Sequence, residues 1–409
     1  METLKRLDQK LDVLSVFSAI GQDTVWRSFR QCLYGITAGT DDALERYGNF
    51  LGALYNLGHT DNWTEYVKKL VLSMETPCSW FASRGQEIPA YMEEAARQDL
   101  RTLSEAAAMT AERMQAGMPE HPAFLPCWQT DAIDLEALYF ERLANVQQYG
   151  FGIYANYRMF RMEQSEREPD GFLLKPVKYP DAVSVEDLIG YELQRKQVIE
   201  NTKALLRGRK AANVLLYGDA GTGKSASVKA IANAYADRGL RLIELGKEEL
   251  HLLPKLLDLL SSNPLKFILF IDDLSFQDND DDFSALKAVL EGSVAARSHN
   301  TVIYATSNRR HIVRETFSAR EGDEVHRQDT MQETISLSER FGIKVYFEKP
   351  KKDLYLEIVY GLAQQYGLSM DRETLALEAE RFALRKSGRS ARAARQLIEQ
   401  LSASVEDKE

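Results

Sequence analysis

Cysteine, histidine and long apolar segments are scarce in this chain of 409 residues. The three cysteines, Cys32, Cys78 and Cys127, lie far apart, and no C-x-x-C pair occurs. The six histidines are scattered, without an H-E-x-x-H motif. These absences argue against a disulfide scaffold and against a zinc site. Buried thiols in a reducing compartment are the simpler interpretation, so we expect a cytoplasmic protein.

No apolar run approaches the roughly 20 residues that a transmembrane helix needs. At the N-terminus, Asp8, Lys10 and Asp12 interrupt the apolar residues, so the continuous stretch of a signal peptide is missing. We therefore expect neither a signal peptide nor a membrane partner.

The net charge of −10 is distributed unevenly along the chain. Residues 1–170 carry 16 lysines and arginines against 25 aspartates and glutamates, whereas residues 171–409 carry 35 against 36. Contacts to phosphate backbones need lysine and arginine, so the acidic first part predicts a poor nucleic-acid binder. A DNA-related role is possible through the second part but has little support.

Residues 1–165 are predicted to form a mostly helical N-terminal domain. Residues 92–114 are rich in good helix formers, and Leu100, Leu103 and Ala107 make an apolar stripe at helical spacing. The four tryptophans of the chain all lie in this part, and we expect them to pack between helices rather than to form a ligand site. Residues 166–182, which are polar and contain prolines, are predicted to be a linker.

Residues 183–350 predict an α/β domain with a parallel sheet, because short apolar runs alternate with helical stretches. The predicted strands are Val214–Tyr217, Leu242–Leu245, Phe267–Ile271, Val302–Thr306 and Lys344–Phe347, and the predicted helices between them include Ala226–Asp237 and Phe283–Ala296. Residues 351–405 contain three further helical segments and predict a small C-terminal helical lobe.

The strongest motif is G-x-x-x-x-G-K-[ST], which occurs between the strand NVLLY and the helix SASVKAIANAYA. Its glycines let backbone N–H groups turn toward a phosphate, and the helix N-terminus adds partial positive charge. Lys224 would contact the β- and γ-phosphates, and the Ser225 hydroxyl would bind Mg²⁺. The residues expected to bind the nucleotide here are Gly218, Asp219, Ala220, Gly221, Thr222, Gly223, Lys224, Ser225 and Ala226.

A second motif is the apolar strand Phe267–Ile271, which is followed directly by Asp272 and Asp273. At the end of a buried strand beside the phosphate loop, Asp272 can hold Mg²⁺, and Asp273 can orient or deprotonate an attacking water. The alternative is a buried strand that ends in capping aspartates.

Together with these two motifs, Thr306-Ser307-Asn308 at the end of another strand resembles the AAA+ ATPases, with Asn308 in the sensor 1 position. The segment around Arg340 (LSERFG) resembles the one that carries the arginine finger in several AAA+ proteins. Residues 388–392 (GRSAR) open a helix where sensor 2 is expected, with Arg392 the first candidate and Arg389 and Arg395 its competitors.

The resemblance covers roughly residues 180–405 and extends to a segment that closes over adenine, here with Ile189 and Gly190. The strings NVLLYGDAGTGKS, FIDDLSF, IYATSNRRH and SLSERFG are similar to an uncharacterised bacterial family of AAA+ ATPases, a domain of unknown function. That family also has a helical region before its ATPase module. The resemblance therefore implies a fold and an ATPase with ATP and Mg²⁺, but no substrate.

By the same resemblance, Arg340 would act on the nucleotide of a neighbouring subunit, which implies a homo-oligomer. An intrachain salt bridge is the alternative for Arg340, and a solvated helix face is the alternative for Arg392. The chain departs from most AAA+ proteins at Asp273, where they have Glu. Because the shorter side chain holds its carboxylate about an ångström farther from the water, a slow ATPase is expected.

We expect a catalytic set of Asp273, Lys224, Asn308, Arg340 and Arg392, with Ser225 and Asp272 at the metal. The leading hypothesis is an ATPase that remodels or loads a macromolecular partner, bound as a protein through the N-terminal domain. The alternatives are an ATP-dependent switch or adaptor that hydrolyses slowly, and a P-loop kinase acting on a small molecule.

Overall fold

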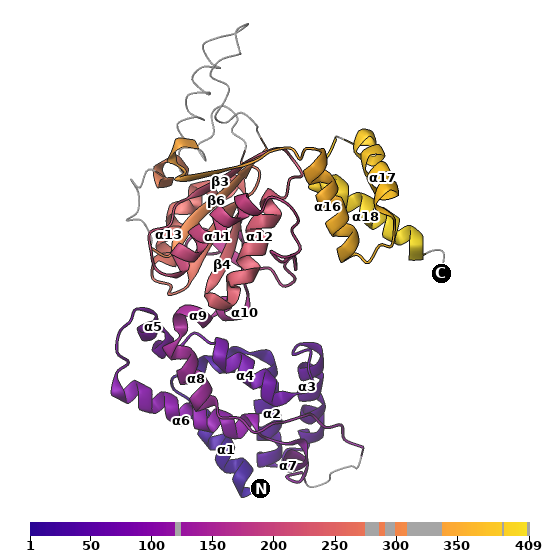
Figure 1. Ribbon diagram of the computed structural model, residues 1–409. Helices are drawn as coiled ribbons and strands as arrows, with labels where there is room; N and C mark the ends of the chain where they lie inside the picture. The colour runs from indigo at the N-terminus through magenta and orange to yellow at the C-terminus, as the bar shows by residue number, and fades with distance from the viewer. Residues whose placement is uncertain (119–123, 275–285, 291–298, 309–337, 387, 407–409) are drawn as a thin grey trace. The chain divides into compact units, whose positions relative to one another are not determined.

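The computed structural model describes residues 1–118, 124–274, 286–290, 299–308, 338–386 and 388–406. The chain divides into two compact units, Met1–Asn156 and Tyr157–Glu409 (Figure 1). Each unit has its own hydrophobic core.

The first unit is built from helices, as the sequence predicts. They are α1 (Glu2–Asp12), α2 (Thr24–Ala38), α3 (Ala43–Asn56), α4 (Trp63–Ser73), α5 (Pro77–Ser83), α6 (Ala90–Ala107), α7 (Ala111–Gln115), α8 (Leu135–Ala144), α9 (Val146–Tyr149) and α10 (Ile153–Asn156), with a 3-10 turn at Ser18–Gln22. Side chains cap several of these helices, such as Asp23, which accepts from the backbone N–H of Trp26 at the start of α2.

Aromatic side chains fill the centre of this unit. Trp63 is fully buried and stacks on Trp26 with 5.8 Å between ring centroids, and its indole N–H donates to the carbonyl of Ala106. Trp128 is buried as well and donates to the carbonyl of Met109. These three tryptophans are core residues, as expected, whereas Trp80 is 45% exposed.

The second unit contains a seven-stranded sheet in the order β2-β1-β4-β5-β6-β3-β7. Its strands are β1 (Met159–Gln164), β2 (Phe172–Pro176), β3 (Val214–Gly218), β4 (Leu240–Leu245), β5 (Lys266–Ile271), β6 (Thr301–Ser307) and β7 (Ile343–Phe347). All neighbouring strands are parallel except β1 and β2, which are antiparallel. Strands β4, β5 and β6 are almost entirely buried, which agrees with their continuous apolar runs.

Strands β1 and β2 differ from the sequence prediction. Strand β1 lies at the end of the predicted N-terminal domain, 1–165, and β2 lies within the predicted linker, 166–182. The polar residues 165–171 connect the two strands, and β1 also pairs in parallel with β4. The pairing extends the sheet beyond the predicted 183–350 domain, and the unit boundary falls earlier, at Asn156 and Tyr157.

Helices α11 (Glu192–Leu206), α12 (Lys224–Tyr235) and α13 (Leu253–Ser261) accompany the sheet, with 3-10 turns at Ala236–Arg238 and Lys247–Leu252. The C-terminal lobe contains α16 (Lys352–Gln365), α17 (Arg372–Arg385) and α18 (Ala391–Glu406), which pack on one another (Figure 1). The predicted helix Phe283–Ala296 is described only at 286–290, where it is helical, and the rest of it lies outside the described residues.

Within the described ranges, none of the helices combines the length and the apolar character that crossing a membrane requires.

Candidate functional site

The sheet topology brings three predicted motifs to one edge. Strand β3 runs into the phosphate loop, β5 ends immediately before Asp272, and β6 ends immediately before Asn308. Strand β6 lies between β3 and β5, and all three are parallel. Their carboxyl ends therefore meet, which is where open α/β sheets bind their ligands.

Glycines shape the loop from Gly218 to Gly223. Gly218 has φ +130°, and a Cβ added there would lie 2.2 Å from the carbonyl oxygen of Phe347. Gly221 and Gly223 also have positive φ, and Gly223 is the N-cap of α12. Side chains other than glycine are strained in these conformations, so the loop depends on its glycines. The first amides of α12 then remain available to an anion.

Lys224 begins α12 and turns its side chain back along the loop. Its Nζ donates to the carbonyl oxygens of Gly218 (3.1 Å) and Asp219 (2.7 Å) and to Oδ1 of Asn308 (3.0 Å). The residue is only 5% exposed. An ammonium group in this position is shielded from solvent, and none of its three hydrogen-bond partners is a carboxylate.

Burial lowers the pKa of Lys224 to about 8. The carboxylates of Asp219, Asp272 and Asp273 raise this pKa but do not offset the burial, and the positive charge of Arg392 lowers it further. A buried lysine with a lowered pKa is characteristic of functional sites, because an incoming anion restores its preference for the charged form.

Acidic and hydroxyl groups complete the cluster. The Ser225 and Thr306 hydroxyls both donate to Oδ1 of Asp272, each at 2.6 Å. Thr306 also accepts from the backbone N–H of Asp273 at 2.9 Å, and Asn308 donates from Nδ2 to Oδ1 of Asp273 at 2.8 Å. Thr306 belongs to the predicted sensor segment, but its hydroxyl bridge between the two aspartates is not readable from the sequence.

Asp273 has a left-handed backbone, with φ +53°. Aspartate and asparagine adopt this conformation more readily than other residues with a Cβ. The backbone N–H of the next residue, Leu274, donates to the carbonyl of Thr306 at 2.7 Å, which fixes this bend against β6.

The C-terminal lobe contacts the loop at Arg392. Its backbone N–H donates to the carbonyl of Gly221 at 3.1 Å, and a Cβ on Gly221 would lie 3.2 Å from the Cβ of Arg392. Arg389, a competitor for the sensor 2 position, instead forms a two-bond ion pair with Glu380, at 2.9 and 2.7 Å. That pairing raises the pKa of Arg389 and lowers the pKa of Glu380.

The loop also contacts the junction between β7 and the lobe through Asp219. Its Oδ2 accepts from the backbone N–H of Lys349 at 3.0 Å, while its own N–H donates to the carbonyl of Phe347 at 3.1 Å. The sequence identifies Asp219 only as a loop residue. Its link to this junction depends on β7 lying next to β3, which the sequence does not reveal.

Ile189 and Gly190 face the lobe helix α16. A Cβ on Gly190 would lie 2.8 Å from a methyl of Leu354, and a Cβ on Gly361 would lie 2.5 Å from Ile189. Buried Arg195 donates to the carbonyls of Gly190 and Leu188 and holds this segment in place.

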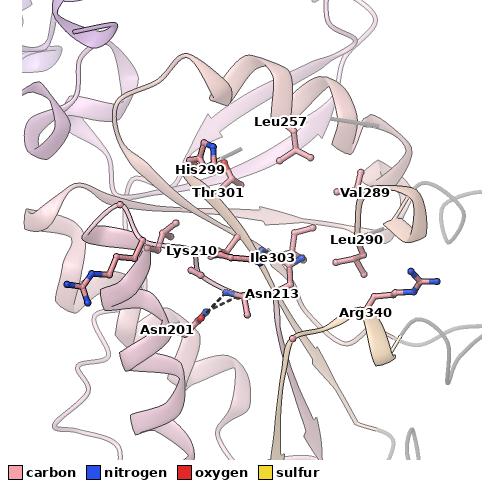
Figure 2. A pocket seen from close by; sticks show the side chains of 17 residues that line it. Asn201, Lys210, Asn213, Leu257, Val289, Leu290, His299, Thr301, Ile303 and Arg340 are labelled. Carbon is pink, nitrogen blue, oxygen red and sulfur yellow. Dashed lines mark hydrogen bonds between the residues drawn. The ribbon is translucent and has the colours of Figure 1, made fainter. Parts of the chain in front are cut away.

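Arg340 lies away from the cluster of Lys224, Asp272, Asp273 and Asn308. It lines a separate cavity of about 840 Å³ with Asn213, Thr301 and Gly342, which lie at the amino ends of β3, β6 and β7 (Figure 2). This is the opposite edge of the parallel sheet from the phosphate loop. Within one copy of the chain, the structure therefore separates Arg340 from the other predicted catalytic residues.

The fold and the edge cluster define the class of this protein, a P-loop α/β protein with a helical lobe. More narrowly, the family described as "Protein of unknown function (DUF815)" matches residues 155–405, and the chain belongs to this family. The expected membership in an uncharacterised family, a domain of unknown function, is thereby confirmed. The match begins close to the boundary between the two units.

Solved structures similar to the chain include the RuvB Holliday junction branch migration motor of Thermotoga maritima, with 17% identity and a TM-score of 0.38. Two single-substitution variants of that protein match with TM-scores of 0.37 and 0.39 at 17% and 16% identity. Each match covers 55% of this chain and 66%, just under two thirds, of the other. No similar sequence was found among curated proteins.

Proposed function

We propose that this protein binds ATP with Mg²⁺ and hydrolyses it to remodel or load a macromolecular partner. The observation that carries the proposal is the hydrogen-bonded cluster of Lys224, Ser225, Asp272, Asp273 and Asn308 at the carboxyl edge of the sheet. Phosphoryl transfer needs positioned charge and an oriented water more than covalent help, and this cluster contains groups for both.

The groups at Ser225 fit a magnesium ion. The Ser225 hydroxyl and the Asp272 carboxylate converge to 2.6 Å, and both are oxygen donors of the kind that Mg²⁺ prefers. We assign the metal to these two residues, with the remaining positions left for water and phosphate. A bound Mg²⁺ would supply charge neutralisation at the phosphates.

The other residues have separable tasks. Lys224 would exchange its two carbonyl partners for phosphate oxygens, which offer an anion to its desolvated ammonium group. Asp273 would accept the proton of the attacking water, and Asn308, which donates to Asp273 at 2.8 Å, would orient that carboxylate. Arg392 adjoins the loop through Gly221 and would sense the γ-phosphate from the lobe.

Arg340 would complete the site of a neighbouring copy. It lies at the amino edge of its own sheet, so it is unsuited to its own phosphate loop. A homo-oligomer that places this edge against the next copy's nucleotide would make hydrolysis depend on assembly. The first unit, which has its own core, would bind a protein partner. Its acidic charge disfavours DNA.

Two alternatives remain distinct proposals. The shorter carboxylate of Asp273 favours a switch or adaptor that binds ATP and hardly hydrolyses it. A small-molecule kinase would instead need an acceptor and would work as a monomer.

Phosphate release and mass by light scattering, measured with and without Mg-ATP, separate these functions. A remodelling ATPase releases phosphate and assembles with ATP; a switch assembles without steady release; a kinase stays monomeric and transfers the phosphate. Lys224→Ala should abolish ATP binding. If calorimetry at millimolar ATP detects no binding to the wild type, all three functions are wrong.

The partner can be sought with Asp273→Asn, which should hold ATP without hydrolysing it. A protein retained by this variant with ATP, and lost when residues 1–156 are removed, would be the expected ligand of the first unit.

A further inference from the structure

The cavity of about 840 Å³ at the amino edge of the sheet is outside the phosphate-binding site. Cavities of this size accommodate small organic ligands. Its floor is apolar and is formed by Leu205 from α11, Leu257 from α13, Leu290 from the helical residues 286–290, and Ile303 from β6. Figure 2 shows Leu257, Leu290 and Ile303 around the cavity. Leu205 and Leu290 are buried by packing against the rest of the unit, so the apolar floor of the cavity exists without a ligand.

The charged side chains among the described residues that line this cavity all have one sign. Arg209, Lys210 and Arg340 line the cavity and are exposed, and no aspartate or glutamate occurs among the described residues that line it. Neither Arg209 nor Lys210 forms an ion pair within the described ranges. A ligand with an apolar body and one anionic group therefore matches this cavity. Its anion can contact the cationic side chains, and its apolar body is removed from water by the apolar lining.

The main-chain groups beside the cavity favour a small molecule over a peptide as its ligand. The backbone N–H of Ala212 donates to Oδ1 of Asn201, and the backbone N–H of Ile303 donates to Oδ1 of Asn213, each at 2.9 Å. The N–H of Ile343 donates to the carbonyl of Asn213 at 3.2 Å. With these main-chain groups already bonded, the edge offers little to an extended peptide backbone.

We propose that this cavity binds a small organic anion with an aliphatic or aromatic body, held by the apolar floor and by Arg209 and Lys210. The binding itself is independent of the ATPase assignment. One consequence rests on the proposed function: because Arg340 lines the same cavity, a bound anion would lie beside the side chain that we assign to the neighbouring copy's nucleotide.

The full chain can be titrated with 8-anilinonaphthalene-1-sulfonate, which has an aromatic body and one anionic group. Fluorescence should report saturable binding with a dissociation constant on the order of 10⁻⁵ M, as expected for a ligand of its size. The double variant Arg209→Glu/Lys210→Glu should weaken binding about tenfold at low salt, because attraction becomes repulsion at exposed positions.

The matched control is Lys178→Glu/Lys196→Glu, which makes a similar change of charge at two exposed residues outside the cavity. It should bind the probe as the wild type does, and Val289→Gln, which places a polar group in the lining, should weaken binding without changing the charge. Equal weakening by both charge variants, or no saturable binding, would each overturn the proposal. A loss of ATP binding alone would contradict the proposed function and not this site.

Discussion

Asp273 combines the position proposed for the base with an uncommon backbone conformation. Its φ of +53° is one that aspartate tolerates better than glutamate, and its N–H and carboxylate are bonded to Thr306 and Asn308. The residue type thus suits the bend after β5 as well as the proposed role as a base. This gives a physical reason for aspartate where most AAA+ proteins have glutamate, beyond the length of the side chain.

These two effects can be separated with Asp273→Glu. The longer side chain should bring the carboxylate nearer the water and raise turnover, by up to about 10²-fold if the distance limits the reaction. The left-handed backbone should cost about 1 kcal/mol of stability. Phosphate release and thermal unfolding measure the two effects, with Asp273→Asn as the control that keeps the bend and loses the base. Unchanged or slower turnover in the glutamate variant would show that reach is not limiting.

Lys224 predicts a pH dependence of ATP binding. Its pKa is about 8 in the free protein because of burial, and a bound triphosphate should raise it. Below pH 8 the lysine is already charged, so the affinity should be nearly constant. Above pH 8 binding must take up a proton, so the affinity should fall by up to about tenfold per pH unit.

Calorimetry in two buffers with different ionisation enthalpies measures this proton directly. Uptake should be small at pH 7 and should approach one proton at pH 9. Equal uptake at the two pH values would contradict the assignment of the titrating group to Lys224.

At the scale of elements, the phosphate loop is attached to the lobe on two sides. Asp219 accepts from the N–H of Lys349, just before α16, and Gly221 accepts from the N–H of Arg392 at the start of α18. Tyr191, next to the segment with Ile189 and Gly190, donates to the carbonyl of Glu348 at 2.7 Å. A shift of the loop on binding phosphate would therefore be transmitted to the lobe at two points, before α16 and at the start of α18.

Asp219→Ala tests this connection. Loss of the acceptor should weaken the attachment of residues 348–351 to the phosphate loop by about 1 kcal/mol. Backbone amide hydrogens at the start of α16 should then exchange with solvent about fivefold faster. Phosphate affinity should change little, because the loop bonds phosphate through its backbone. Asp219→Asn is the control, since its side-chain oxygen can still accept. Identical exchange in the alanine variant and the wild type would show that Asp219 does not hold the junction.

The strands differ in how clearly the sequence predicts them. The apolar runs of β4, β5 and β6 predict buried parallel strands to within two residues at each end, because no other arrangement buries such runs so simply. Strands β1 and β2 are short and half-polar, and the residues that connect them are charged as in a linker, so the sequence does not predict them as strands. Motif residues could be found from spacing, whereas the contacts of Thr306 and Asp219 depend on which strands are neighbours.

For the whole molecule, the separation of Arg340 from the phosphate loop is the main consequence of the fold. If the nucleotide binds at the carboxyl edge as proposed, a residue at the amino edge of the sheet could cooperate with it only between copies. The sequence indicates the arginine by resemblance, but only the strand directions show that it faces away from its own site.

Mixing two inactive variants tests cooperation between copies. Arg340→Ala retains an intact phosphate loop, and Lys224→Ala retains an intact Arg340, so each alone should release little phosphate. In oligomers formed from a 1:1 mixture, about a quarter of the interfaces join an intact phosphate loop to an intact Arg340 of the neighbouring copy. Activity should therefore return to about that fraction of the wild type. Arg381→Ala, at an exposed lobe position paired with Glu378, should keep full activity alone. If Arg340→Ala alone is fully active, or if the mixture assembles but stays inactive, hydrolysis does not use Arg340 from a neighbouring copy.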